Sequence, residues 1–270
     1  MSKYIHGTSS EEQQRLTLLN TVLLNEACLK ELSLLGGERI LDVGSGLGQF
    51  SRAMARKSKA AVLGIERSEE QINEARRQAK TDREEELAEF RKGDARQLPL
   101  RDDEWGTFDV AWTRFVLEHV PDPLNVAKQM VRAVRKGGRV VLADDDHDIL
   151  RLYPEIPEFS ELWIAYMQTY SALDNDPLVG RKLVSLLHES GAVPVRNTWI
   201  FFGSCSGNER FDIYVDNLIG VVEGAKEQIV RQGLFEKKRF DRAMAHFMSW
   251  RKQPDATLWY AVSWVEGIKR

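Results

Sequence analysis

Short apolar runs alternate with longer amphipathic stretches over the first half of the chain. Residues 40–43 and 61–66 are short and rich in strand-forming residues, as are strands buried on both faces of a parallel sheet. Residues 50–57 carry apolar positions at helical spacing, and Ser68 is a predicted N-cap for a second helix over 69–80. Strands that alternate with helices in this way predict a parallel sheet with helices on both faces.

The alternation continues to about residue 145. Further strands are expected near Phe90, at 108–112 and at 139–143. Asp122 and the proline after it combine an N-cap with the residue favoured at the first helical position, so a helix is predicted over 123–135.

The second half of the chain departs from this simple alternation. Residues 157–173 carry an aromatic stripe at helical spacing, and 208–254 contains two further helical patterns. A helix is expected over 180–190, a strand over 193–203 and a last strand over 257–268. We therefore expect the sheet to be completed by strands that lie on either side of a helical insertion.

Composition and charge narrow the class of protein. The net charge of −3 offers no general field for nucleic acid. The N-terminus lacks the apolar stretch of a signal peptide, and no apolar run approaches membrane-spanning length. Cys28 and Cys205 are too few for a disulfide framework. We expect a cytoplasmic protein with reduced thiols that binds neither nucleic acid nor a membrane.

Three glycines alternate directly after the first predicted strand, at Gly44, Gly46 and Gly48. A strand that turns through glycines into a helix brings bare backbone N–H groups next to a ligand. The dinucleotide fingerprint needs its last glycine at the sixth position, and counting from Gly44 that position is Gln49. The turn predicts a cofactor cradle and argues against a nicotinamide dinucleotide.

Polar residues also follow the next three strands. Glu66 ends the second strand, where a carboxylate can accept both hydroxyls of a ribose, and Asp94 follows the third. Arg114 stands just beyond the fourth. Either carboxylate could instead cap the helix or turn that comes after it.

Taken in order, these residues resemble the class I S-adenosylmethionine-dependent methyltransferases, in their small-molecule branch, over roughly residues 36–145. The resemblance implies an α/β fold with a doubly wound, Rossmann-like sheet of seven strands. The sheet would be mostly parallel with its last strand antiparallel, helices on both faces and a helical lid or insertion. It implies transfer of a methyl group from S-adenosylmethionine to a small organic acceptor by in-line displacement, mainly through proximity and orientation. Whether the acceptor atom is oxygen, nitrogen or carbon stays open.

The resemblance also implies which residues bind the methyl donor. The glycine turn would face its methionine end and ribose, Glu66 the ribose diol, and Asp94 with the N–H of Ala95 the adenine. Asp42 would order the turn and favour the donor's ammonium group. In related methyltransferases a Tyr-x-x-Gly stretch like that at Tyr4 folds over the cofactor; a frayed terminus is the alternative. The complete candidate set is Tyr4, Asp42, Gly44, Ser45, Gly46, Gln49, Glu66, Arg67, Asp94, Ala95 and Arg114.

Candidates on the acceptor side are fewer. His119 is a candidate general base because histidine titrates near neutrality, although this family often carries a Leu-x-His that packs structurally. Tyr153 and Trp163 are candidate pocket walls, with ordinary core packing as the alternative.

Residues 144–148, Asp-Asp-Asp-His-Asp, follow the fifth strand and point into the same crevice. Their oxygen and imidazole groups could hold a divalent metal. Consecutive residues on an extended segment point in opposite directions, however, so few of them could converge. We therefore expect Asp145 and Asp146 to bind the acceptor, with simple solvation of a loop as the alternative, and we expect no metal.

We expect one methyltransferase domain over residues 1–270. Its parts would be an N-terminal lid segment and helix, a cofactor-binding core, two helical insertions, and a closing helix with strands. These parts are 1–35, 36–147, 148–178 with 208–254, and 179–207 with 255–270. The insertions would cover the acceptor pocket, or 208–254 would form a homodimer surface.

Other functions on this framework remain open at this point. They are a nucleic-acid or protein methyltransferase of the same fold, a NAD(P)-dependent oxidoreductase, and a non-catalytic cofactor-binding subunit. Residues 113–116, Thr-Arg-Phe-Val, stand where amino-directed nucleic-acid enzymes carry Asp/Asn-Pro-Pro-aromatic. No Tyr-x-x-x-Lys pair follows the fourth strand to serve an oxidoreductase.

Overall fold

The computed structural model describes residues 25–270, so Tyr4 lies outside the described part of the chain. One sheet of eight strands runs through that part, in the order β3-β2-β1-β4-β5-β8-β6, with β7 also paired to β8. The strands are β1 Ile40–Val43, β2 Val62–Glu66, β3 Ala88–Lys92, β4 Phe108–Arg114, β5 Val134–Asp145, β6 Arg151–Tyr153, β7 Ala192–Cys205 and β8 Thr257–Lys269.

The strand direction reverses at β8. Strands β1 to β5 pair in parallel, and Asp42 of β1 lies between Gly64 of β2 and Trp112 of β4. Strand β8 runs antiparallel to β5, β6 and β7. The predicted doubly wound, mostly parallel sheet with an antiparallel last strand is confirmed. It has eight strands instead of seven because β6 adds three residues beside the start of β8, too few to show any periodicity.

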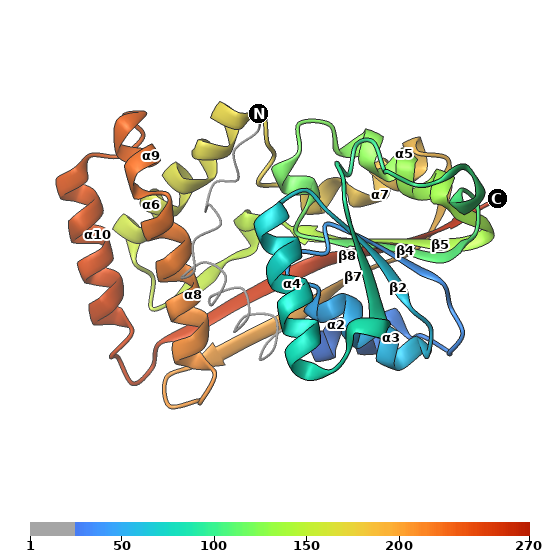
Figure 1. The fold of residues 1–270 in the computed structure, drawn as a ribbon. Coiled ribbons are helices and arrows are strands. Elements are labelled where there is room, and N and C mark those ends of the chain that lie inside the picture. The colour runs from blue at the N-terminus through green and yellow to red at the C-terminus, as the bar shows by residue number, and fades with distance from the viewer. Residues whose placement is uncertain (1–24) are drawn as a thin grey trace.

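Helices cover the parallel strands and also form a second group beside them (Figure 1). Those over the sheet are α2 Asn25–Leu32, α3 Gln49–Ser58, α4 Glu69–Asp82, α5 Pro123–Ala133 and α7 Leu183–Glu189. The second group, called the helical layer below, comprises α6 Pro157–Gln168, α8 Phe211–Gly224, α9 Lys226–Arg231 and α10 Lys237–Trp250. Short 3-10 turns join these elements, among them η4 Leu117–His119, η5 His147–Ile149, η6 Thr169–Leu173 and η7 Val179–Lys182.

Two of the helix starts follow the predicted capping chemistry. The side chain of Ser68 accepts a hydrogen bond from the backbone N–H of Gln71, and that of Asp122 from Asn125. The helix predicted over 157–173 is present as α6 followed by η6. Within residues 25–270, no helix combines the length and apolar character that a membrane crossing needs.

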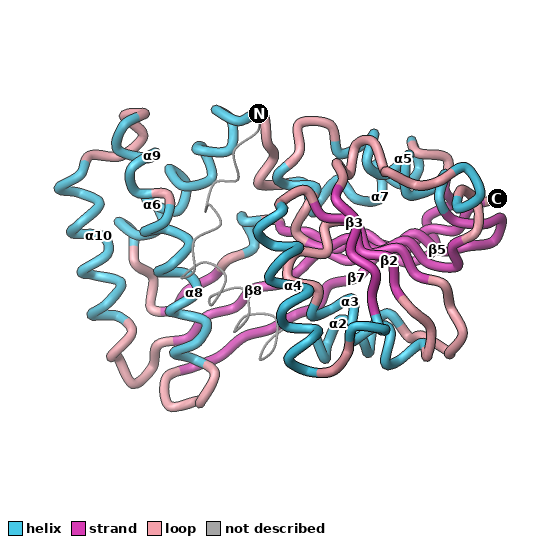
Figure 2. Tube along the Cα trace, viewed as in Figure 1, coloured by secondary structure: helices cyan, strands magenta, loops and turns pink. Residues whose placement is uncertain are grey.

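A hydrophobic core lies on each face of the sheet. On one face, Trp112 of β4 and Trp264 of β8 pack with ring centroids 5.0 Å apart, in a core shared by α3 and the helical layer. On the other face, Met130 of α5 and Leu187 of α7 are fully buried. Strands β7 and β8 continue as a ribbon past the parallel strands and under the helical layer, and β6 pairs with the far end of this ribbon (Figure 2). The ribbon thus connects the two parts of the molecule.

Candidate functional site

A cavity of about 230 Å³, open to solvent, lies at the carboxyl ends of the parallel strands. This is the end of a doubly wound sheet where ligands bind. The glycine turn, α4 and the segments after β3 and β4 form its walls. Ten sequence-predicted residues line it: Asp42, Gly44, Ser45, Gly46, Gln49, Glu66, Arg67, Asp94, Ala95 and Arg114. His119 lines it as well.

The glycine turn needs its glycines for different reasons. All three have positive φ, of 79° at Gly44, 53° at Gly46 and 68° at Gly48. A Cβ at Gly44 would lie 2.2 Å from Val116 Cγ2, and one at Gly48 would lie 2.1 Å from Phe90 Cζ. At Gly46 the nearest such atom, on Gln71, is 3.6 Å away. Gly44 and Gly48 therefore serve packing, whereas Gly46 leaves space in the cavity wall.

The turn does not present its N–H groups in the way the sequence suggested. The N–H groups of Gly44 and Ser45 donate to Ile65 O at 2.8 and 3.0 Å, and that of Gly46 donates to Glu66 Oε2 at 3.1 Å. These three donors are used to join the turn to β2. The turn therefore provides space for a ligand at Gly46, whereas these three N–H groups are already bonded within the protein.

The two carboxylates at the strand ends are held in different ways. Glu66 also accepts hydrogen bonds from the backbone N–H groups of Arg67 and Ser68, at 2.7 and 2.8 Å, which fixes its carboxylate beside the turn. Asp94 forms a two-pronged ion pair with Arg96, with N–O distances of 3.0 and 2.7 Å. The hydrogen bonds from Arg96 hold the pKa of Asp94 below its usual value.

Asp42 lies beneath the turn and is buried. It accepts a hydrogen bond of 2.5 Å from Ser51 Oγ, and burial raises its pKa to about 6. Arg114 bonds to Asn25 Oδ1 at 3.1 Å and lies over the ring of Phe50, 4.8 Å from its centroid. Arg114 thereby ties α2 and α3 to the cavity wall.

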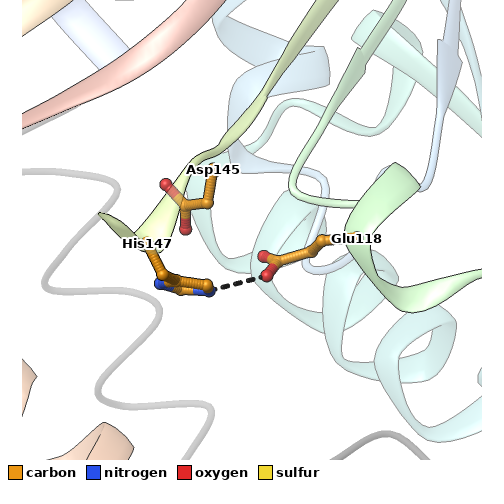
Figure 3. A group of neighbouring side chains, drawn as sticks. All are labelled: Glu118, Asp145 and His147. Carbon is orange, nitrogen blue, oxygen red and sulfur yellow. Dashed lines mark hydrogen bonds and ion pairs between the residues drawn. The ribbon is translucent and has the colours of Figure 1, made fainter. Parts of the chain in front are cut away.

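A cluster of three polar side chains lies close to His119. Glu118, Asp145 and His147, called the Glu118 cluster below, come from η4, β5 and η5 and point toward one another (Figure 3). Glu118 Oε2 lies 2.9 Å from His147 Nε2, and its Oε1 lies 3.4 Å from His119 Nε2. A buried carboxylate therefore stands between two imidazoles, one of which faces the cavity.

Aromatic side chains surround the Glu118 cluster. The hydroxyl of Tyr170 lies 3.2 Å from His147 Nε2, and that of Tyr260 lies 3.2 Å from His147 Nδ1. Trp163 Nε1 donates to the backbone oxygen of His147 at 2.7 Å. Trp163 is thus buried against this cluster.

Charge distribution in the cluster shifts several pKa values. Although burial alone would raise the pKa of Glu118, the two neighbouring imidazoles hold it at about 2. Burial and the charge of Glu118 raise the pKa of Asp145 to about 7. Burial disfavours the charged form of His147, but the charge of Glu118 and the hydrogen bond to it raise its pKa above the ordinary value. The contact between Glu118 and His147 therefore favours their charged forms, and the pKa of Asp145 lies near neutral pH.

The structure separates other predicted acceptor residues from this region. Asp146 forms a two-pronged ion pair with Arg181, with N–O distances of 2.6 and 2.7 Å. Tyr153 lies on β6 with 59% of its surface exposed, and neither residue lines the cavity. Of residues 144–148, Asp145 and His147 converge with Glu118. They lie two residues apart, so they share one side of an extended segment, and this signal was present in the sequence.

The segment that forms most of the cavity wall is similar in sequence to known proteins. Residues 41–142 match a family model described as a methyltransferase domain. The methyltransferase GfsG of Streptomyces halstedii is 35% identical over 121 residues, which is 45% of this chain and 42% of that protein. The segment from β1 to β5, which forms most of the cavity wall, is therefore similar to a methyltransferase domain. Another relative, the 27-O-demethylrifamycin SV methyltransferase of Amycolatopsis mediterranei, is 34% identical over 52% of this chain and 50% of its own. The chain spans about half the length of these curated relatives.

Solved structures share the fold of this chain at low sequence identity. Geranyl diphosphate C-methyltransferase from Streptomyces coelicolor, solved with Mg²⁺, geranyl diphosphate and S-adenosyl-L-homocysteine, has a TM-score of 0.57 and 14% identity. The match covers 97% of this chain and 85% of that one. The [4+2]-cyclase SpnF has a TM-score of 0.54 and 16% identity, over 96% of this chain and 81% of its own. The fold thus occurs in proteins named for different reactions, so the fold alone does not decide the reaction.

Proposed function

We propose that this protein transfers a methyl group from S-adenosylmethionine to a small organic acceptor. The observation that carries the proposal is the cavity beside Gly46, where a carboxylate fixed by backbone N–H groups adjoins open space. Support also comes from the relatives, one of which is named for the methylation of a rifamycin precursor.

The residues on the cavity wall suit the parts of this methyl donor. Gly44, Ser45 and Gly46 would accommodate its methionine end and ribose without side-chain collision, and Glu66 would accept hydrogen bonds from the ribose hydroxyls. Asp94 and Ala95 would contact the adenine. The other proposed contacts are Asp42, Gln49, Arg67 and Arg114. When bound, the donor supplies an electrophilic methyl group on a sulfonium.

The protein's main contribution to the reaction would be orientation of the acceptor toward that methyl group. His119 would accept the proton of an oxygen or nitrogen acceptor, since it lines the cavity and Glu118 stands 3.4 Å away to stabilise the imidazolium. The helical layer would cover the acceptor and exclude water. The single domain would comprise a cofactor-binding core over 36–147, a closing helix with strands, and helical insertions. A homodimer surface remains the alternative role for 208–254, and light scattering would detect it.

Calorimetric titration of the full chain with S-adenosylhomocysteine tests the proposal. We expect micromolar binding, weakened about 10-fold or more by Gly46→Ala, because the added methyl group enters the cavity at a backbone φ of 53°. Gly207→Ala is the matched control, since Gly207 has a φ of 84°, has open space around it and does not line the cavity. Absence of binding to the wild-type protein, or equal binding by both variants, would refute the site. Turnover of methyl-labelled donor with candidate acceptors then tests the reaction itself.

A further inference from the structure

The Glu118 cluster brings together three side chains from separate elements at the carboxyl ends of β4 and β5. Glu118 and His147 are buried, with 3% and 5% of their surfaces exposed. One potential ligand atom from each of Glu118, Asp145 and His147 lies within 4.8 Å of the other two (Figure 3). The donor set is one imidazole nitrogen and two carboxylate oxygens.

Hydrogen bonds leave one part of this cluster without a partner. Both ring nitrogens of His147 have neighbours, in Glu118 and the hydroxyls of Tyr170 and Tyr260. Tyr260 also bonds to the Asp145 carboxylate, yet Asp145 Oδ1 is buried and accepts no hydrogen bond from any residue within 25–270. A buried carboxylate oxygen without a donor is costly, so a bound group that contacts this oxygen would be favoured.

The neighbouring residues do not supply this missing partner. Asp144, Asp145 and Glu118 are three neighbouring carboxyl groups, and Asp144 is satisfied by the backbone N–H groups of residues 116, 117 and 145. The guanidinium of Arg181, on the neighbouring turn η7, is bonded to Asp146 and Asp148 instead.

We propose that Glu118, Asp145 and His147 bind a divalent transition-metal ion. A nitrogen ligand beside two carboxylates suits Mn²⁺, Fe²⁺, Co²⁺ or Zn²⁺ better than Mg²⁺, which takes oxygen ligands. Ligand bonds of about 2.0–2.2 Å place adjacent ligand atoms about 3 Å apart, close to the 2.9 Å between Glu118 and His147. Rotation of the Asp145 side chain would complete the set. Water would take the remaining positions.

The site would adjoin the donor cavity, because Glu118 also contacts His119 on the cavity wall. If the proposed methyl transfer is correct, the ion would be placed to orient an oxygen of the acceptor. Metal binding itself does not depend on the methyl donor. The two proposals therefore fail separately.

Metal binding is tested on the full-length, tag-free chain after removal of metals with a chelator. Titration with Co²⁺ alone, followed by visible absorption, and elemental analysis after dialysis against Zn²⁺ are expected to show one ion per chain. Asp145→Asn keeps the shape of the side chain and removes its charge, and we expect it to weaken binding at least 10-fold. Asp148→Asn is the matched control, because Asp148 lies three residues further along with a 61% exposed side chain.

The metal titrations either support or overturn the proposed metal site. Loss of the bound ion in Asp145→Asn but not in Asp148→Asn supports the site, provided that circular dichroism shows both variants folded. Absence of stoichiometric binding by the wild type, or equal binding by the two variants, overturns it and leaves a hydrogen-bonded ion pair only. Titration of the same metal-free protein with S-adenosylhomocysteine reports independently on the donor site.

Discussion

The glycine turn and the Glu118 cluster lie at the same end of the sheet but are built in opposite ways. The turn is one continuous segment, and its N–H groups and the Glu66 carboxylate complete each other's hydrogen bonds. The cluster collects side chains from η4, β5 and η5, and its two carboxyl groups lie close to one another. A site made by backbone is encoded locally, whereas a site made by converging side chains depends on how distant elements pack.

The two regions also differ in the charged groups that surround their carboxyl groups. Asp94 at the cavity has an arginine partner and a lowered pKa, whereas Asp145 in the cluster has acidic neighbours and a pKa raised to about 7. Substitutions in the cluster should therefore change stability mainly through unpaired charge. Substitutions in the turn should act through backbone strain and steric overlap.

The largest effect is expected for Glu118→Ala. Removal of this carboxylate leaves the buried His147 ring without the partner that raises its pKa, and breaking a buried pair of this kind costs about 3–5 kcal/mol in free energy of unfolding. Urea denaturation of the metal-free protein would measure it. Glu69→Ala is the control, because its ion pair with Lys92 is exposed and should contribute less than about 1 kcal/mol. Similar losses in both variants would remove the distinction between the two regions.

Gly48→Ala should be the most damaging small change in the turn. The new methyl group would overlap the ring of Phe90 at a φ of 68°, so strain and overpacking together should lower the free energy of unfolding by about 3 kcal/mol. Gly207→Ala carries a comparable φ without overlap and should cost only about 1 kcal/mol. Equal costs measured in urea would mean that the Phe90 contact does not restrict this position.

Asp42 should make stability depend on pH. In the folded protein the pKa of Asp42 is about 6, above the ordinary aspartic acid value of 3.8. Between these two pH values the folded state therefore retains a proton that the unfolded chain has released. The contribution to stability is complete below about pH 4 and is lost as pH rises through 6, a total of about 3 kcal/mol. The wild type minus Asp42→Asn difference in unfolding free energy, measured by urea titration from pH 4 to 7, should fall accordingly. A flat difference would contradict the prediction.

The smallest effect is expected for Tyr170→Phe. The hydroxyl bonds to Tyr166 at 2.8 Å and to His147 at 3.2 Å, and its loss should lower the free energy of unfolding by about 1 kcal/mol. Tyr153→Phe removes a hydroxyl from a 59% exposed side chain and should change it by less than about 0.5 kcal/mol. Indistinguishable midpoints in thermal or urea unfolding would indicate that the aromatic shell contributes packing alone.

Local patterns were enough to predict the parallel strands, the capped helices and the cavity residues from Asp42 to Asp94. Each depends on neighbours within one strand–turn–helix unit. The role of the turn's N–H groups could not be predicted, because it depends on Ile65 of the next strand. The surroundings of His147 were equally inaccessible, since its partners Glu118 and Tyr260 lie 29 and 113 residues away along the chain.

The long β7–β8 ribbon has a mechanical consequence. Strand β8 is continuous from the core under the helical layer to the parallel sheet (Figure 1). Leu258, near its start, is buried in that core, and Glu266, near its end, forms an ion pair with Arg139 of β5. Strand β7 is hydrogen-bonded along the whole length of β8, so no unpaired stretch separates the helical layer from the sheet. We therefore expect the two parts of the molecule to move together instead of bending about a joint in β8.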